Sequence, residues 1–139
     1  MVLNRQRRIR VSVADLEKFL ARARRTLRLP AGSLTVCLVT NAEIARWNRS
    51  YRGKRGPTDV LSFQADEKPG HGVKCYIGDI AIAPVIALRN ARRFGRTFED
   101  EMRILILHGM LHLMGYDHET DTGQMDRRER RLRRAFGLA

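Results

Sequence analysis

The order of apolar and polar positions along the chain predicts short strands that alternate with longer helices. Residues 8–13 alternate basic and apolar side chains, which is the two-residue period of a half-buried strand. After residue 13 the period becomes helical, and one apolar stripe is formed by Leu16, Phe19, Leu20, Ala23 and Leu27. Three further strands are expected at residues 33–40, 58–63 and 76–83.

Four more helices are expected between and after these strands. Two short helices are predicted over residues 41–51, with Asn41 as N-cap, and over 84–94, with Pro84 in the first turn. The next helix begins near Thr97 with a capping-box-like start and is apolar on nearly every face as far as residue 114. A last, strongly charged helix is expected over residues 120–136.

This order of elements predicts the fold class. The order β-α-β-α-β-β-α-α-α favours an α/β (α+β) fold, with a four-stranded mixed sheet packed by about five helices. The whole chain, residues 1–139, is the size of one domain and contains no internal repeat. The apolar helix before residue 114 is expected to be its central, buried helix.

The composition narrows the choice of partner and compartment. The chain carries 27 basic and 15 acidic residues, a net charge of +12, and such an excess usually marks a polyanionic partner. Nucleic acid is favoured over a merely solubilising basic surface, and over a membrane. No apolar run is long enough to span a bilayer, and the basic N-terminus is not followed by the apolar segment of a secretory signal. We therefore expect a cytoplasmic protein that binds no membrane.

Three of the four histidines lie within twelve residues of one another and indicate a metal site. His108 and His112 are four apart, so they project from one face of the central helix. Gly115 suits the end of that helix, and a turn after it can return His118 to the pair. Three neutral imidazoles leave a tetrahedral metal one open position, which is how catalytic zinc sites are built. The alternative is that these are buried core histidines.

The spacing HxxxHxxGxxH also matches the metzincin metalloproteases, except at one position. Those enzymes carry a glutamate after the first histidine as general base, and here that position is Gly109. The ligands are therefore present and the proteolytic base is missing. A structural zinc would usually have four protein ligands and favour cysteine, but Cys37, on a predicted strand, and Cys75, next to one, both lie far from the motif.

Three stretches of the chain resemble the YbeY family of bacterial endoribonucleases, the rRNA maturation factors. The family's C-terminal motif is similar to residues 108–118, including the glycine where a protease has glutamate. A second match joins Tyr51 and Arg52 to residues 57–63, and a third is Gly78-Asp79-Ile80. One departure is Gln64, where family members often have proline.

The resemblance implies one zinc ion per chain, with His108, His112 and His118 as the metal ligands. It implies cleavage of single-stranded RNA, late maturation of ribosomal RNA at the 3′ end of the small-subunit rRNA, and ribosome quality control. The expected partners are therefore single-stranded RNA, ribosomal RNA and the small ribosomal subunit. Arg52 corresponds to the family's functionally important arginine, so Arg52 and His108 are the expected catalytic residues.

The expected chemistry is phosphodiester hydrolysis. A zinc ion held by three imidazoles lowers the pKa of bound water and polarises a phosphoryl oxygen, and Arg52 can offer a bidentate fork to the developing charge. The alternative for Arg52 is a solvated side chain in a basic loop. The attacking group is either the activated water or the RNA 2′-hydroxyl, and no general base is evident. Asp59, Asp79 and Asp117 are candidates for supporting an imidazole or for capping loops.

Two other functions remain open from the sequence. One is a zinc peptidase that uses Asp79 or Asp117 as its base, and the other is a non-catalytic ribosome-assembly factor with a structural metal. With three tyrosines, five phenylalanines and one tryptophan, base stacking on an aromatic platform is not an evident binding mode. A groove lined by arginine is expected instead.

Overall fold

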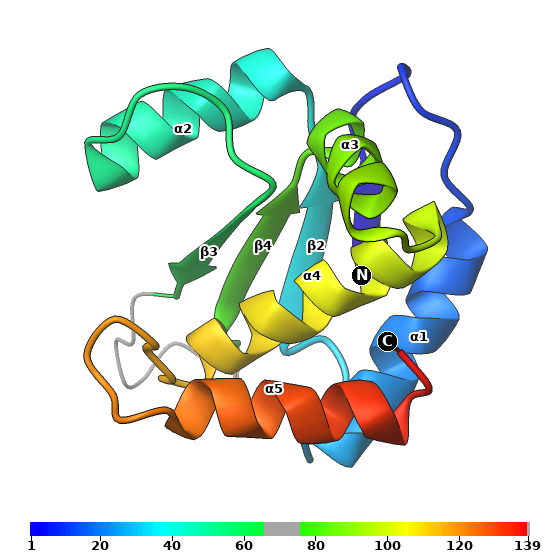
Figure 1. Ribbon diagram of the computed structural model, residues 1–139, viewed down its shortest axis with the longest axis vertical. Coiled ribbons are helices and arrows are strands. Elements are labelled where there is room, and N and C mark those ends of the chain that lie inside the picture. Colours follow the sequence, from blue (N-terminus) through cyan, green and yellow to red (C-terminus); the bar gives the residue numbers. More distant parts are fainter. Residues whose placement is uncertain (66–75, 139) are drawn as a thin grey trace.

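The computed structural model describes residues 1–65 and 76–138 and contains the expected mixed sheet and helices (Figure 1). The strands are β1 (Val2–Asn4), β2 (Leu34–Leu38), β3 (Val60–Gln64) and β4 (Gly78–Ile82). The helices are α1 (Val13–Thr26), α2 (Asn41–Arg52), α3 (Pro84–Phe94), α4 (Phe98–Leu113) and α5 (Gln124–Ala135). The predicted fold class is therefore confirmed. Among these helices, none is both long and apolar enough to cross a bilayer.

The four strands form one sheet in the order β1-β2-β4-β3. The β1 and β2 strands are parallel, β2 and β4 are parallel, and β3 runs antiparallel to β4 at the edge. Val36 pairs with Ile80 at the centre, and Leu61 of β3 pairs with Ala81. The β3 strand also lies beside the central helix, because Ser62 and Gln64 donate side-chain hydrogen bonds to the backbone carbonyls of Gly109 and His112.

Side chains alternate between the two faces of the sheet, and each face has its own core. On one face Val36, Ile80 and Ile82 pack with α1, α4 and α5. On the other face Leu61 and Ala81 pack with α2. Figure 1 shows α4 lying across the sheet, with α5 running along its outer side and α2 apart at the opposite face.

The central helix α4 is buried on nearly all sides, as its sequence predicts. Met102, Ile106, Leu107, Met110 and Leu111 are fully buried. Each such side chain contributes roughly 1.5–3 kcal/mol of hydrophobic stabilisation. Thr97 caps the helix by accepting a hydrogen bond from the backbone N–H of Asp100. The helix that carries two of the histidines is thus rigidly held.

The helix and sheet come unusually close at Gly109. A Cβ atom built on this residue would lie 2.8 Å from Cγ2 of Ile80, which is fully buried on β4. Position 109 therefore faces the sheet. A glutamate here, as in the proteases, would clash with the sheet instead of reaching a site beside the histidines.

The first strand is not where the alternating pattern placed it. The prediction of a strand at residues 8–13 is wrong, because the strand β1 lies earlier, at Val2–Asn4, and pairs with β2. Residues 5–12 form a connection in which the buried Gln6 side chain bonds to the backbone of Ile9. Ser12 then accepts a hydrogen bond from Asp15 as the N-cap of α1. Residues 8–13 are therefore a loop followed by a helix cap. Over so few residues, such a segment can show the same alternation of polar and apolar side chains as a short strand.

Two predicted helix boundaries also shift. Thr40, and not Asn41, caps α2 by accepting a hydrogen bond from the backbone N–H of Glu43. The last helix begins at Gln124 and not at residue 120, because the Asp121 carboxylate takes the backbone N–H groups of Gly123 and Met125 in a preceding turn. Of the two cysteines, Cys37 lies on β2 as expected, and Cys75 lies outside the described residues.

Candidate metal centre

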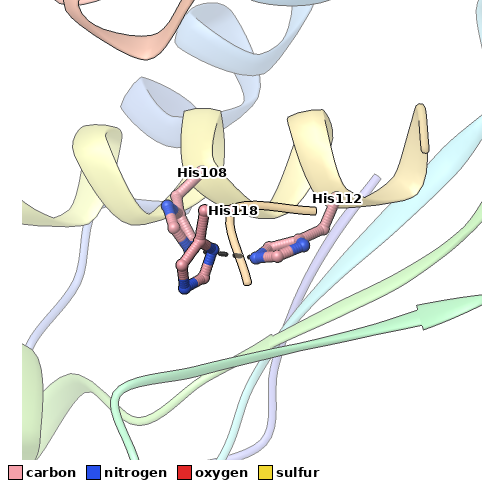
Figure 2. A group of neighbouring side chains, drawn as sticks. All are labelled: His108, His112 and His118. Atoms are coloured by element: carbon pink, nitrogen blue, oxygen red, sulfur yellow. Dashed lines mark hydrogen bonds between the residues drawn. The ribbon is translucent and has the colours of Figure 1, made fainter. Parts of the chain in front are cut away.

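The three histidines of the motif converge in space (Figure 2). One ring nitrogen from each of His108, His112 and His118 lies within 4.8 Å of the others. The first two project from the last turns of α4, and the third comes from the following loop. The ring centroids of His108 and His118 are 5.7 Å apart, and those of His112 and His118 are 5.4 Å apart.

The turn after α4 brings His118 back to the pair. Gly115 adopts a φ of +99°, a region that favours glycine, so the chain reverses directly after the helix. The backbone N–H of Tyr116 then bonds to the carbonyl of Leu111, which holds the reversed segment against the helix. Asp117 stabilises the turn around His118, because its carboxylate accepts a hydrogen bond from the backbone N–H of Glu119. Local turn chemistry thus sets the position of the third imidazole.

The hydrogen bonds of the first two imidazoles fix their tautomers. Nδ1 of His108 lies 2.6 Å from a carboxylate oxygen of Glu129. Nδ1 of His112 lies 3.1 Å from the backbone carbonyl oxygen of Tyr116. Both oxygens are acceptors, so each Nδ1 carries a proton, and each ring in its neutral form presents a bare Nε2.

The two bare Nε2 atoms face each other at 3.1 Å. Two nitrogen lone pairs this close repel unless a proton or a cation lies between them. Zinc–nitrogen bonds of about 2.0–2.1 Å at a tetrahedral angle separate two ligand nitrogens by about 3.3–3.4 Å. The observed pair is close to that separation, and the residues present therefore fit a zinc ion held through Nε2.

The protonation states also favour a cation. Burial lowers the pKa of His112, and the neighbouring His108 and His118 rings lower it further. For Glu129, burial alone would raise the pKa, but the hydrogen bond from His108, the positive charge of that ring when it is protonated, and the charge of Arg133 outweigh burial and hold the pKa low. A neutral imidazole is the form that binds a metal, and an ionised carboxylate accepts the hydrogen bond that orients such an imidazole.

Glu129 is the residue that the sequence reasoning missed. It lies on α5 and is mostly buried, with a side chain 15% exposed, beside the imidazole of His108. A signal was present: Glu129 falls between Met125 and Leu132 on the buried stripe of α5, at helical spacing. An acid on the inner face of an arginine-rich helix requires a buried partner, and here that partner is a histidine.

The three aspartates considered from the sequence have other partners. Asp117 caps the turn and Asp79 bonds to the hydroxyl of Tyr76. Asp59 accepts hydrogen bonds from the backbone of Val60 and the side chain of Asn90. The observed contacts of these aspartates are therefore those of loop-capping and structural residues. The carboxylate that supports an imidazole is that of Glu129.

The histidines open onto a cleft of about 710 Å³ between β3, the end of α2 and the loop after α4. Arg52 lines the same cleft although it is 56 positions before His108 in the sequence. Its guanidinium lies 3.6 Å from the carboxylate of Glu119, and its side chain is 45% exposed. Exposed ion pairs of this kind are weak, so the arginine is free to exchange its partner.

The sequence predicts a helix over residues 41–51 and therefore places Arg52 after it, in a basic loop, and this detail is wrong. It is the last residue of α2, because Gly53 takes the left-handed conformation and its N–H bonds to the carbonyl of Arg49. The arginine is thus fixed to a helix end. Gln64, the departure from the family pattern, also lines the cleft, and its amide donates to the carbonyl of His112.

The fold and the histidine cluster define a class of small α/β proteins that present three imidazoles from a central helix and the turn after it. The chain belongs to the endoribonuclease YbeY family. The family model described as Endoribonuclease YbeY matches residues 1–137.

Individual relatives agree with this assignment. A protein described as Endoribonuclease YbeY from Sulfurovum sp. (strain NBC37-1) is 37% identical, over 98% of this chain and 90% of its own length. Another protein described as Endoribonuclease YbeY, from Koribacter versatilis (strain Ellin345), is 41% identical, over 96% of this chain and 83% of its own length. The fold is similar to the solution structure of a Thermotoga maritima protein, with a TM-score of 0.61 and 30% identity, covering 99% of this chain and 90% of that one. Membership in this family supports a nuclease role.

Proposed function

We propose that this chain is a zinc-dependent endoribonuclease that cuts single-stranded RNA. The observation that carries the proposal is that three imidazoles suited to one metal ion share a cleft with Arg52. We further propose that it acts in late maturation of ribosomal RNA, at the 3′ end of the small-subunit rRNA, and in ribosome quality control. This role places it in the cytoplasm with the small ribosomal subunit as its partner.

The proposed metal ligands are His108, His112 and His118, through their ring nitrogens. When bound, a zinc ion supplies positive charge that lowers the pKa of a water molecule and polarises a phosphoryl oxygen. Glu129 holds the His108 ring in the orientation that leaves Nε2 free for the metal. In this proposal His108 therefore contributes to catalysis as a metal ligand.

Arg52 is the proposed electrostatic stabiliser of the reacting phosphate. A guanidinium offers two parallel N–H donors to a phosphate, and phosphoester hydrolysis gathers negative charge on oxygen. In the free protein the charge of Arg52 is shared with Glu119. A phosphate that enters the cleft replaces this weak partner with a stronger one.

The experiment that tests this function is cleavage of single-stranded RNA by the purified protein, with and without a chelator. We expect cleavage that is lost with the chelator and regained on addition of zinc. His112→Ala should lose both bound zinc and cleavage. Gln64→Ala, which alters the same cleft without removing an imidazole, should retain its zinc and is the matched control.

The same preparations separate the two other functions. Chelator-sensitive hydrolysis of casein without RNA cleavage would indicate a peptidase and overturn the proposal. RNA binding without cleavage, with unfolding on metal removal, would indicate an assembly factor with a structural metal. Stoichiometric zinc in His112→Ala would contradict the ligand assignment.

A further inference from the structure

An exposed aromatic ring lies at the cleft. Four large apolar side chains of the described residues are strongly exposed, and among them only Tyr51 lines the cleft. Its side chain is 72% exposed. An exposed ring beside a candidate active site is a surface to which a flat ligand can bind.

The Tyr51 ring is supported from behind. It packs against Phe63 of β3 in a T-shaped arrangement, with ring centroids 5.1 Å apart at an interplanar angle of 67°. Phe63 in turn packs against Trp47 at 5.8 Å and 90°. This chain of rings joins the exposed tyrosine to the core between α2 and the sheet. The ring is thus positioned before any ligand arrives, which reduces the entropy lost on binding.

Tyr51 and Arg52 are neighbours on the last turn of α2, and both line the cleft. The end of this helix is fixed by the left-handed Gly53 and by the Asn48 side chain, which donates to the carbonyl of Gly56. One rigid helix end therefore presents an aromatic ring and a guanidinium side by side. A nucleotide offers a matching pair, a flat base and an adjacent phosphate.

We propose that Tyr51 stacks on an unpaired base of the RNA, next to the phosphate that Arg52 binds. The inference rests on the proposed function and adds a nucleobase subsite to it. Every base has a flat face, so such stacking tolerates different sequences. Bases inside a duplex already stack on their neighbours and cannot reach the ring. Tyr51 therefore contributes to selectivity for single strands.

This proposed subsite differs from the expectation drawn from the small number of aromatic residues. A platform of many rings is absent from the cleft walls in the described part of the chain, where the lining aromatics are Tyr51, Phe63 and Tyr116. One well-placed exposed ring is sufficient for one base. The sequence shows the tyrosine but does not show that it faces the cleft.

The test uses a short single-stranded RNA that carries 2-aminopurine, a fluorescent base that is quenched when it stacks. The label is moved through successive positions, and fluorescence is read on rapid mixing, before turnover. We expect quenching at one position with the wild-type protein, loss of that quenching with Tyr51→Ala, and its retention with Tyr51→Phe. Tyr51→Ala should also raise KM on the order of tenfold, with a smaller change in kcat.

Phe94→Ala is the matched control, because Phe94 is also exposed, at 56%, and does not line the cleft. It should leave quenching and KM unchanged. If the wild type cleaves RNA and Tyr51→Ala has the same KM and quenching as wild type, the stacking proposal is wrong. If the wild type cleaves no RNA, the proposed function is wrong instead. If Tyr51→Phe and Tyr51→Ala lose quenching equally, the effect belongs to the tyrosine hydroxyl, and the stacking proposal is also wrong.

Discussion

The imidazole of His108 and the carboxylate of Glu129 meet where α4 packs on α5, with Nδ1 2.6 Å from Oε1. The two residues are 21 positions apart and lie on different helices. The bond fixes which nitrogen of His108 faces the other histidines. The last helix of the chain therefore contributes to the candidate metal centre although it contains no candidate ligand.

Removing this carboxylate should weaken metal binding. Glu129→Ala leaves the His108 ring free to rotate and to change tautomer, and we expect zinc affinity to fall roughly 10- to 100-fold. Glu129→Gln keeps an acceptor oxygen but loses the charge, so the zinc affinity of this variant should fall by less. Competition with a chromophoric chelator measures the zinc affinity of both variants. Asp126→Ala, which removes an exposed acid of the same helix, is the control, and an equal loss from it would refute a specific role for Glu129.

Arg52→Ala should reduce turnover without unfolding the protein. If Arg52 stabilises charge on the reacting phosphate, we expect kcat to fall by on the order of a hundredfold or more. The melting temperature and zinc content should barely change, because the arginine is half exposed and its ion pair with Glu119 is weak. The assay is cleavage of single-stranded RNA at saturating substrate.

Arg55→Ala provides the comparison for Arg52. Arg55 is equally charged and exposed, and it does not line the cleft. We expect it to alter KM modestly through general attraction and to leave kcat unchanged. Equal reductions of kcat in both variants would make Arg52 one member of a basic surface and no more.

Gly109→Ala should destabilise the fold. The added methyl would lie 2.8 Å from a carbon of the buried Ile80 side chain, and overpacking of this kind costs about 1–3 kcal/mol. The better helix propensity of alanine offsets about 1 kcal/mol. We therefore expect the free energy of unfolding, measured in urea, to fall by up to about 2 kcal/mol. In an Ile80→Ala background, Gly109→Ala should not lower the free energy of unfolding. An equal decrease in that background would mean that the strain does not come from contact with Ile80.

RNA binding should depend steeply on salt. The excess of basic side chains gives a net charge of +12, and each phosphate contact releases a counterion. The dissociation constant for single-stranded RNA, measured between low and physiological salt, should rise by orders of magnitude. The metal-free protein should show a similar slope, since the charge lies on side chains. Affinity that does not change with salt would mean that the basic surface serves only solubility.

The sequence by itself determined the features that rest on local spacing. Two histidines four apart on an apolar helix share a face in any fold, and Gly115 permits the reversal that returns His118. The three later strands and all five helices were predicted for the same reason, because their patterns extend over several residues. These signals need no knowledge of distant segments.

Only the tertiary structure decided which distant residues meet. It placed β1 at Val2–Asn4, brought Arg52 and Tyr51 from α2 to the cleft, and set Glu129 against His108. A three-residue strand is stabilised by its partner strand, and its own sequence has too few positions to show a period. Glu129 likewise gains its role from a bond to another helix. Contacts between separate elements depend on how the sheet and helices pack, and local periodicity carries no information about that packing.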